Sequence, residues 1–263
     1  MYQLIGGKCR EKVRAYGGGA TPDWVTCGQP GSRYSADDLI PMLQEWDAEE
    51  WAASLPAWSP EPHCPVWGGF TCHKVCYLPA TMIGGMPQPI VIQACVDAFA
   101  ALRKKVGNSV DLAMDLHGRA SPAIARALVA KLAPYDPMFI EEPILGDDLE
   151  SLLSLQNLST VPIATGERLY TRWQFQDIIA KSAVQIVQPD IITSGECDKR
   201  VSAMLHSTRL VRLCVLIAAG WVVRCYAQQV GSGSFGRSLR RPSRARSASL
   251  RTPRASPRHY ALA

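Results

Sequence analysis

The chain lacks the features that would place it in a membrane or outside the cell. No apolar run reaches the roughly 18 residues that cross a bilayer, and the best candidate, 210–223, contains Arg212. No basic segment followed by an apolar one opens the sequence, so no signal peptide is predicted. The nine cysteines are odd in number and scattered, which does not fit a disulfide framework. We therefore expect a cytoplasmic protein with reduced thiols and no membrane partner.

Acidic residues and lysine are absent from the stretch 231–263, which contains eight Arg and seven Ser. The whole chain has 28 basic and 23 acidic residues, a net charge of +5, and without this stretch the count is 20 against 23, or −3. The basicity therefore belongs to this stretch. Its composition is typical of a disordered tail. A basic arm that binds nucleic acid is the alternative interpretation.

Four apolar runs in the middle of the chain each end on a carboxylate. They are 110–115 ending on Asp115, "MFIEEP" with Glu141, "VPIATGE" ending on Glu167, and "AVQIVQPD" ending on Asp190. The acids are 26, 26 and 23 positions apart, and helices are expected between them at 121–135, 149–158 and 172–180. Strands that alternate with helices predict a parallel sheet, and the near-equal period favours a (β/α) barrel.

In such a barrel the carboxyl ends of the strands form one rim, where the four carboxylates would converge. His117 would face the same side as Asp115, because alternate residues of a strand point the same way. Clustered carboxylates repel one another unless a cation lies among them, and an all-oxygen ligand set favours Mg²⁺. The alternative is that each acid separately forms a turn or caps the helix that follows it.

The ordered phrases "DLHGR", "FIEEP", "GERLYTRW" and "QPD" resemble the enolase superfamily in its mandelate racemase and muconate lactonizing enzyme branch, most closely the galactonate dehydratases. The resemblance covers about residues 107–192. It implies that Asp115, Glu141 and Glu167 bind Mg²⁺, with Glu141 and not Glu142 as the ligand. It also implies that a sugar acid such as galactonate loses water through an enediolate to give a 2-keto-3-deoxy acid, with His117 as general acid.

The resemblance further implies that Asp190 and a histidine on the next strand act together as the base, and that Lys74 and Arg168 contact the substrate. Two departures from the family pattern stand out. Cys76 follows Lys74 where racemases have a second lysine and galactonate dehydratases an asparagine. The expected histidine falls near position 217, which is isoleucine.

We interpret the sequence after about residue 192 as altered by a shift of reading frame. Residues 215–218 can be encoded as GTC CTC ATT GCC, which reads Pro-His-Cys from its third base. This interpretation predicts a partial (β/α) barrel that lacks most of the N-terminal capping domain and the last barrel strands. A catalytically inactive remnant is therefore the main alternative to a dehydratase, and a homo-oligomer is expected only of a full-length form.

The expected domain organisation has four parts. The end of the capping region and the first barrel strand occupy 1–19, an irregular insertion 20–69, the barrel core 70–210, and an aberrant Arg/Ser-rich tail 211–263.

Overall fold

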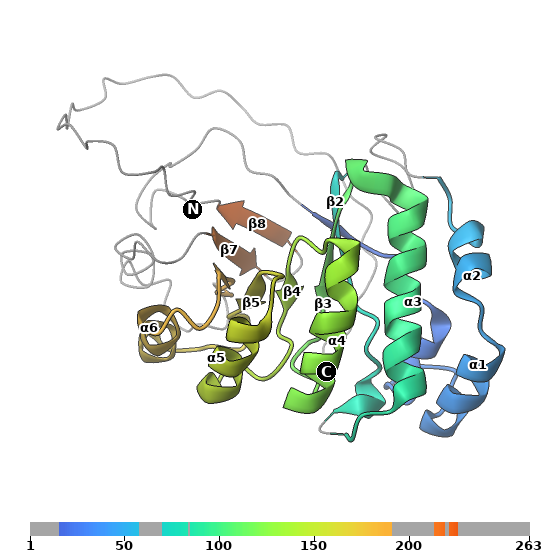
Figure 1. The fold of residues 1–263 in the computed structure, drawn as a ribbon, viewed down its shortest axis with the longest axis horizontal. Helices are drawn as coiled ribbons and strands as arrows, with labels where there is room; N and C mark the ends of the chain where they lie inside the picture. The colour runs from blue at the N-terminus through green and yellow to red at the C-terminus, as the bar shows by residue number, and fades with distance from the viewer. Residues whose placement is uncertain (1–15, 58–69, 84, 191–212, 219–220, 226–263) are drawn as a thin grey trace. The chain divides into compact units, whose positions relative to one another are not determined.

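The computed structural model describes residues 16–57, 70–83, 85–190, 213–218 and 221–225. All of them belong to one compact unit, 1–229, and the second unit, 230–263, lies outside the described residues. The described residues of the first unit form a sheet of eight strands in the order β1 to β8, of which Figure 1 shows β2 to β5 side by side. The strands are β1 Gly17–Gly18, β2 Cys72–Val75, β3 Asp111–Asp115, β4 Ile140–Glu141, β5 Ile163–Thr165, β6 Ile186–Val187, β7 Leu213–Ala218 and β8 Trp221–Cys225.

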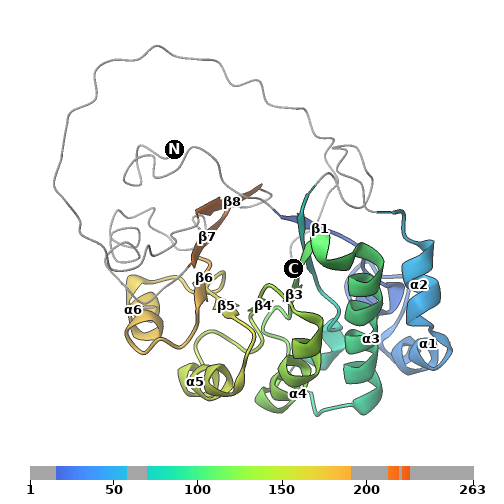
Figure 2. The same cartoon turned by 45° about the horizontal axis from the view of Figure 1, so that its top comes forward.

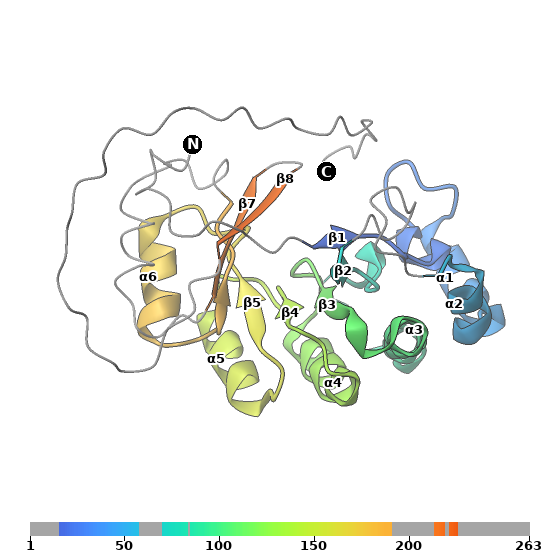
Figure 3. The ribbon, with the colours of Figure 1, turned by 90° about the horizontal axis from the view of Figure 1, so that it is seen from above.

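Strands β1 to β7 pair in parallel, each with the next along the chain. Four helices cover the outer side of the curved sheet, as Figure 3 shows: α3 Pro89–Val106, α4 Pro122–Leu132, α5 Leu149–Leu158 and α6 Arg172–Ala180. The described residues also form short 3₁₀ helices, namely η1 Asp23–Thr26, η2 Ala36–Asp38, η3 Ala80–Met82, η4 Gly107–Ser109 and η5 Ala133–Tyr135. The partial α/β barrel predicted from the repeating pattern is confirmed.

Local sequence explains where the helices begin. Helix α5 starts where the Asp148 carboxylate accepts a hydrogen bond from Ser151 N, 3.1 Å away. Helix α6 starts with a capping box in which Thr171 and Gln174 satisfy each other's backbone N–H groups. The helices predicted at 149–158 and 172–180 are confirmed as α5 and α6, and the helix predicted at 121–135 is α4 followed by η5.

The segment that was expected to be an irregular insertion contains η1, η2 and two helices, α1 Leu39–Glu45 and α2 Ala48–Ser54. Both helices pack beside α3 (Figure 1). Trp24, 1% exposed, is buried with Leu39 and Leu43 in the main core. The two helices have seven residues each, which is too short for a helical period to stand out in the sequence. The rest of the expected insertion, 58–69, lies outside the described residues.

Strands β7 and β8 lie within the range assigned to the tail. Strand β7 continues the parallel sheet beside β6, whereas β8 runs antiparallel to β7 (Figure 2). A regular barrel has a parallel eighth strand, so β8 departs from that pattern. Residues 191–212 and 226–263, on which most of the frame-shift interpretation falls, lie outside the described residues. Of the helices that the structure describes, none combines the length and the apolar character needed to cross a membrane.

The buried apolar residues form two clusters, one on each side of the sheet, and these show which way the side chains of β3 point. Leu112 and Met114 of β3 pack in the larger cluster with the helices, whereas Ala113 belongs to a smaller cluster on the inner side of the sheet. The smaller cluster consists of Tyr16, Cys72, Ala113, Phe139, Ala164 and Ile186. Alternate residues of a strand face the same side, so Asp115 also points inward.

Candidate active site at the carboxyl ends of the strands

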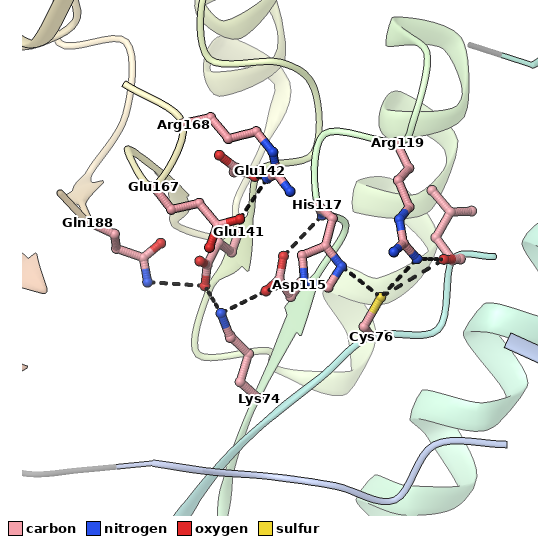
Figure 4. Close-up of polar contacts among 11 residues, drawn as sticks. Lys74, Cys76, Asp115, His117, Arg119, Glu141, Glu142, Glu167, Arg168 and Gln188 are labelled. Carbon is pink, nitrogen blue, oxygen red and sulfur yellow. Dashed lines mark hydrogen bonds and ion pairs between the residues drawn. The ribbon is translucent and has the colours of Figure 1, made fainter. Parts of the chain in front are cut away.

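Polar side chains gather where the parallel strands end. Asp115 is the last residue of β3 and Glu141 the last residue of β4, and the two are direct partners in the β3–β4 register. Glu167 follows β5 by two residues, and Asp190 follows β6 by three. Lys74 reaches the group from β2, as Figure 4 shows.

The Lys74 ammonium lies between two carboxylates. Its Nζ is 2.7 Å from Asp115 Oδ2 and 2.8 Å from Glu141 Oε2. Burial acts to lower the pKa of Lys74, but the charges of Asp115 and Glu141 outweigh it and hold that pKa well above its usual value. Burial likewise acts to raise the pKa of Asp115, and the neighbouring charge of Lys74 holds it below its usual value. The pair is therefore ionised at neutral pH.

The pKa values of Glu141 and Glu167 are raised, whereas that of Asp115 is lowered. Burial first, and then the charge of Asp115, raises the pKa of Glu141 to about 7. The same two causes raise the pKa of Glu167. Gln188 donates from Nε2 to Glu141 Oε2 at 3.1 Å, inside the sheet. These carboxylates repel one another, and a cation among them would offset the repulsion.

Asp115 and His117 form a tight turn after β3. Asp115 Oδ1 accepts a hydrogen bond from His117 N at 3.0 Å, and His117 has φ +51°, a left-handed conformation that is costly for a bulky residue. The turn brings His117 Nε2 to 3.3 Å from Asp115 Oδ2. Burial lowers the pKa of His117, against the opposing effect of Asp115, so the imidazole favours its neutral form.

The second glutamate of the pair points elsewhere. Glu142, with φ +40°, is buried and forms an ion pair with the Arg168 guanidinium. Arg168 Nη1 also lies 2.7 Å from Glu167 Oε1. Figure 4 shows that Glu141 faces Lys74 while Glu142 faces Arg168. Glu141 therefore lies with Asp115 and Lys74, and Glu142 lies with Arg168.

Gly166 allows β5 and β6 to approach closely just before Glu167. It has φ +142°, a conformation open essentially to glycine. A Cβ at this position would lie 2.8 Å from Gln188 N and 2.9 Å from Gln188 C, which are backbone atoms that cannot move aside cheaply. Gly166 therefore sets the position of Glu167 relative to Gln188.

The residues present fit a divalent cation in their chemistry. Asp115, Glu141 and Glu167 offer hard oxygen donors, and Glu141 Oε1 is buried without a hydrogen-bond partner. Within the described ranges no three His, Cys, Asp or Glu side chains are gathered as a formed metal site. The Lys74 ammonium instead takes the position between Asp115 and Glu141.

The structure brings together most of the residues predicted from the sequence and adds three contacts. Asp115, Glu141, Lys74 and His117 are in direct contact, and the charge of Asp190 acts on Glu167. Arg168, expected to bind substrate, pairs with two glutamates of this rim. The additional contacts are made by Cys76, Arg119 and Gln188. Gln188 could have been predicted as a site residue from the sequence. It stands two residues before Asp190 in "QPD", and alternate residues of an extended chain point to the same side.

Comparison with known proteins supports the motifs. A family model described as enolase C-terminal domain-like matches residues 68–210, more than half of the chain. D-galactonate dehydratase of Ralstonia pickettii (strain 12J) is 31% identical over 210 residues, which cover 79% of this chain and 46% of that protein. The enzyme of the same name from Verminephrobacter eiseniae (strain EF01-2) is also 31% identical, with the same coverage. The chain thus spans about half the length of these relatives.

Solved structures agree with the fold. A putative galactarate dehydratase from Agrobacterium radiobacter, solved with sodium and L-malate, is 27% identical with a TM-score of 0.56, covering 82% of this chain and 47% of that one. A mandelate racemase/muconate lactonizing enzyme-like protein from Roseovarius sp. TM1035 is 26% identical with a TM-score of 0.58, covering 78% and 48%. The chain therefore belongs to the enolase C-terminal domain-like family of the enolase superfamily, and within it resembles the galactonate dehydratases.

Proposed function

We propose that this chain carries the barrel site of a Mg²⁺-dependent sugar-acid dehydratase, acting on an aldonate such as galactonate. The observation that carries the proposal is the meeting of Asp115, Glu141 and Lys74 beside His117 at the carboxyl ends of neighbouring strands. The names of the relatives support the same class of reaction. The partner is then a small sugar acid, and the 2-keto-3-deoxy acid is the product.

Each residue has a definite task in this reaction. Asp115, Glu141 and Glu167 would hold Mg²⁺, which when bound stabilises the negative charge of the enediolate. Lys74 and Arg168 are the cationic side chains of the rim and would orient the substrate carboxylate and hydroxyls. His117, next to the cluster, would act as the general acid in its protonated form and donate that proton to the departing hydroxide.

The base is the incomplete part of the site. Strands β6 and β7 pair Ile186 with Leu213 and Val187 with Cys214, each pair 27 positions apart. If this register continued past the end of β6, position 217 of β7 would lie opposite Asp190. The position at which the resemblance calls for a histidine would then be beside Asp190, but it is occupied by isoleucine.

Restoring that histidine tests the proposal. We expect Ile217→His to exchange the proton next to the carboxylate of galactonate for deuterium in D₂O with Mg²⁺, measured by NMR, and Ile217→Ala not to do so. Adding Asp190→Asn to Ile217→His removes the orienting partner and lowers the exchange rate by about 100-fold, within the usual range for general base catalysis. Adding His117→Asn instead leaves exchange in place and abolishes formation of the keto acid.

A non-catalytic barrel is the second candidate, and the isoleucine at position 217 favours it. It predicts that Ile217→His binds Mg²⁺, measured by calorimetry, but shows no more exchange than Ile217→Ala. That result would overturn the dehydratase proposal.

A further inference from the structure

A further cationic side chain, Arg119, lies beside the site without a carboxylate partner among the described residues. Its Nη1 donates to the backbone oxygen Leu78 O at 3.0 Å and lies 3.8 Å from Cys76 Sγ. Lys74 and Arg168, by contrast, each form ion pairs with two carboxylates. Of these three cations, Arg119 is therefore the one whose charge is not balanced within the described part of the chain.

The part of the guanidinium that has no partner is the edge that suits a carboxylate. An arginine carries five N–H donors in a planar fork, and Nη1 is the group of Arg119 that Leu78 O holds. The edge formed by Nε and Nη2 makes no hydrogen bond or ion pair with the described residues. Two N–H groups on one edge bind both oxygens of a carboxylate at once. The contact with Leu78 O thus anchors the guanidinium and leaves its carboxylate-binding edge available.

The turn after β3 places Arg119 next to His117. Arg119 N donates to Leu116 O at 2.9 Å, and the side chain is half-buried. The thiol that Arg119 touches also contacts the imidazole, since Cys76 Sγ is 3.2 Å from His117 Nδ1. Figure 4 shows Arg119 on the side of His117 away from Lys74. The imidazole therefore lies between the guanidinium and the carboxylate cluster.

We propose that Arg119 is a specificity-determining residue that binds a second carboxylate, at the end of the sugar acid remote from the carboxylate cluster. This role rests on the proposed function, which places the first carboxylate of the substrate at the cluster and the leaving hydroxyl at His117. A substrate that lies across the imidazole has its far end at Arg119. The preferred substrate is then an aldarate, which has a carboxylate at each end, and the aldonate with the same hydroxyl groups binds more weakly.

The physical reason for the preference is the unbalanced charge. A half-buried cation without a counter-ion has lost part of its hydration, and a carboxylate compensates for that loss with charge and with two hydrogen bonds. A terminal hydroxymethyl group offers Arg119 one neutral acceptor oxygen, which makes a weaker hydrogen bond. The two ends of the substrate are thus recognised by different cations.

Galactonate and galactarate are suitable probes, because they have the same hydroxyl groups and differ at the carbon farthest from the first carboxylate. That carbon is a hydroxymethyl group in galactonate and a carboxylate in galactarate. Binding of each acid to the unsubstituted full chain with Mg²⁺ is measured by calorimetry at about 0.15 M salt, which screens exposed charges more than about 8 Å apart. We expect galactarate to bind about tenfold more tightly, the lower limit for hydrogen bonds between charged groups. Equal affinities would overturn the role of Arg119 and leave the dehydratase proposal standing.

Substitutions test whether Arg119 is the source of the preference. Arg119→Gln should bring the two affinities to within about twofold of each other, mainly by weakening the binding of galactarate. Arg119→Lys keeps a charge without the fork and should retain part of the preference. Arg126→Gln is the matched control, because it removes an exposed arginine from α4 and should leave the tenfold preference in place. An equal fall in both affinities in Arg119→Gln would indicate a structural role through Leu78 O and overturn the proposal.

Proton exchange in Ile217→His separates this proposal from the proposed function. Tighter binding of galactarate without more exchange than in Ile217→Ala would overturn the dehydratase and support the role of Arg119 in binding. Binding of neither acid to the unsubstituted chain would overturn both proposals.

Discussion

At the scale of single residues, Lys74 and its two carboxylates govern the electrostatics of the site. Lys74 Nζ and Lys104 Nζ each lie 2.8 Å from a glutamate oxygen, but the first pair is largely buried and the second is exposed. Removing one partner of a buried ion pair leaves an uncompensated charge, whereas an exposed pair contributes little. The same distance therefore has very different energetic consequences at the two positions.

We expect Lys74→Met to lower the free energy of unfolding by about 3–5 kcal/mol at pH 7 without added metal, measured by urea denaturation. Lys104→Met is the control and should change it by less than about 1 kcal/mol. Equal effects of the two substitutions would show that Lys74 does not neutralise the cluster.

Glu141 gives the metal-free protein a distinctive pH dependence. Its pKa rises from 4.5 to about 7 on folding, so the folded state binds the proton more tightly than the unfolded state. Its contribution to stability is complete below pH 4.5 and is lost as the pH rises to 7, with a slope of at most about 1.4 kcal/mol per pH unit. Urea denaturation across this range should show that slope reduced in Glu141→Gln. A slope that survives the substitution would assign it to other groups.

Some site residues could be predicted from the sequence and others could not. Asp115 and Glu141 stood out because each ends an apolar run at a regular interval. The contact between Cys76 and His117 joins residues 41 positions apart that lie just after the neighbouring strands β2 and β3, and no local pattern indicates it. The position of the Lys74 ammonium depends in the same way on the pairing of β2 with β3.

At the scale of elements, the junction of β5 and β6 depends on Gly166. Gly166→Ala should lower the free energy of unfolding by about 3 kcal/mol or more, since it combines an unfavourable φ with backbone contacts under 3.0 Å. Gly107→Ala is the control, because Gly107 also has a positive φ, +61°, but an added Cβ meets nothing within 4 Å. Gly107→Ala should lower the free energy of unfolding by about 1–3 kcal/mol, from the backbone conformation alone. Thermal unfolding measures both, and equal losses would exclude steric contact as the cause at Gly166.

The helices of the 23–54 segment are part of the folded unit and can be tested as such. Trp24→Ala should destabilise the protein by about 3–5 kcal/mol, because it empties a fully buried aromatic site beside Trp46. Trp173, 59% exposed and stacked on Arg172, is the matched control. Trp173→Ala should cost about 1 kcal/mol or less in chemical denaturation. A similarly small loss for Trp24→Ala would show that the segment is not anchored to the core.

Helix α3 was not predicted, although it is the longest of the described helices at 18 residues. It packs against α1 and α2 as well as α4, so buried residues occupy more than one face. It lies before the first of the four apolar runs that end on a carboxylate, so the spacing of those runs, which placed α4, α5 and α6 between them, does not extend to it. The antiparallel direction of β8 was not predicted either, because an isolated apolar run such as Trp221–Cys225 does not indicate strand direction.

At the scale of the whole molecule, the excess of positive charge is confined to residues 231–263. Deleting residues 231–263 changes the formal net charge from +5 to −3. We expect the full chain to be retained on heparin at low salt and released as salt rises, and the deletion variant to flow through. Replacing the eight arginines of this stretch with glutamine is the control for length. Retention of the deletion variant would place a basic surface elsewhere in the chain.

The row of rings that joins the 23–54 segment to the barrel also has an optical consequence. Trp24, Trp46, Trp51 and Tyr77 follow one another with ring centroids 5.5–6.0 Å apart. Chromophores at such distances exchange excitation, so the intact row should produce a strong near-ultraviolet circular dichroism band and quench its own emission. Among the tryptophans whose side chains the structure describes, the exposed Trp173 should contribute a red-shifted emission. The row of rings thus reports on the packing of α1 and α2, and Trp173 reports on the start of α6.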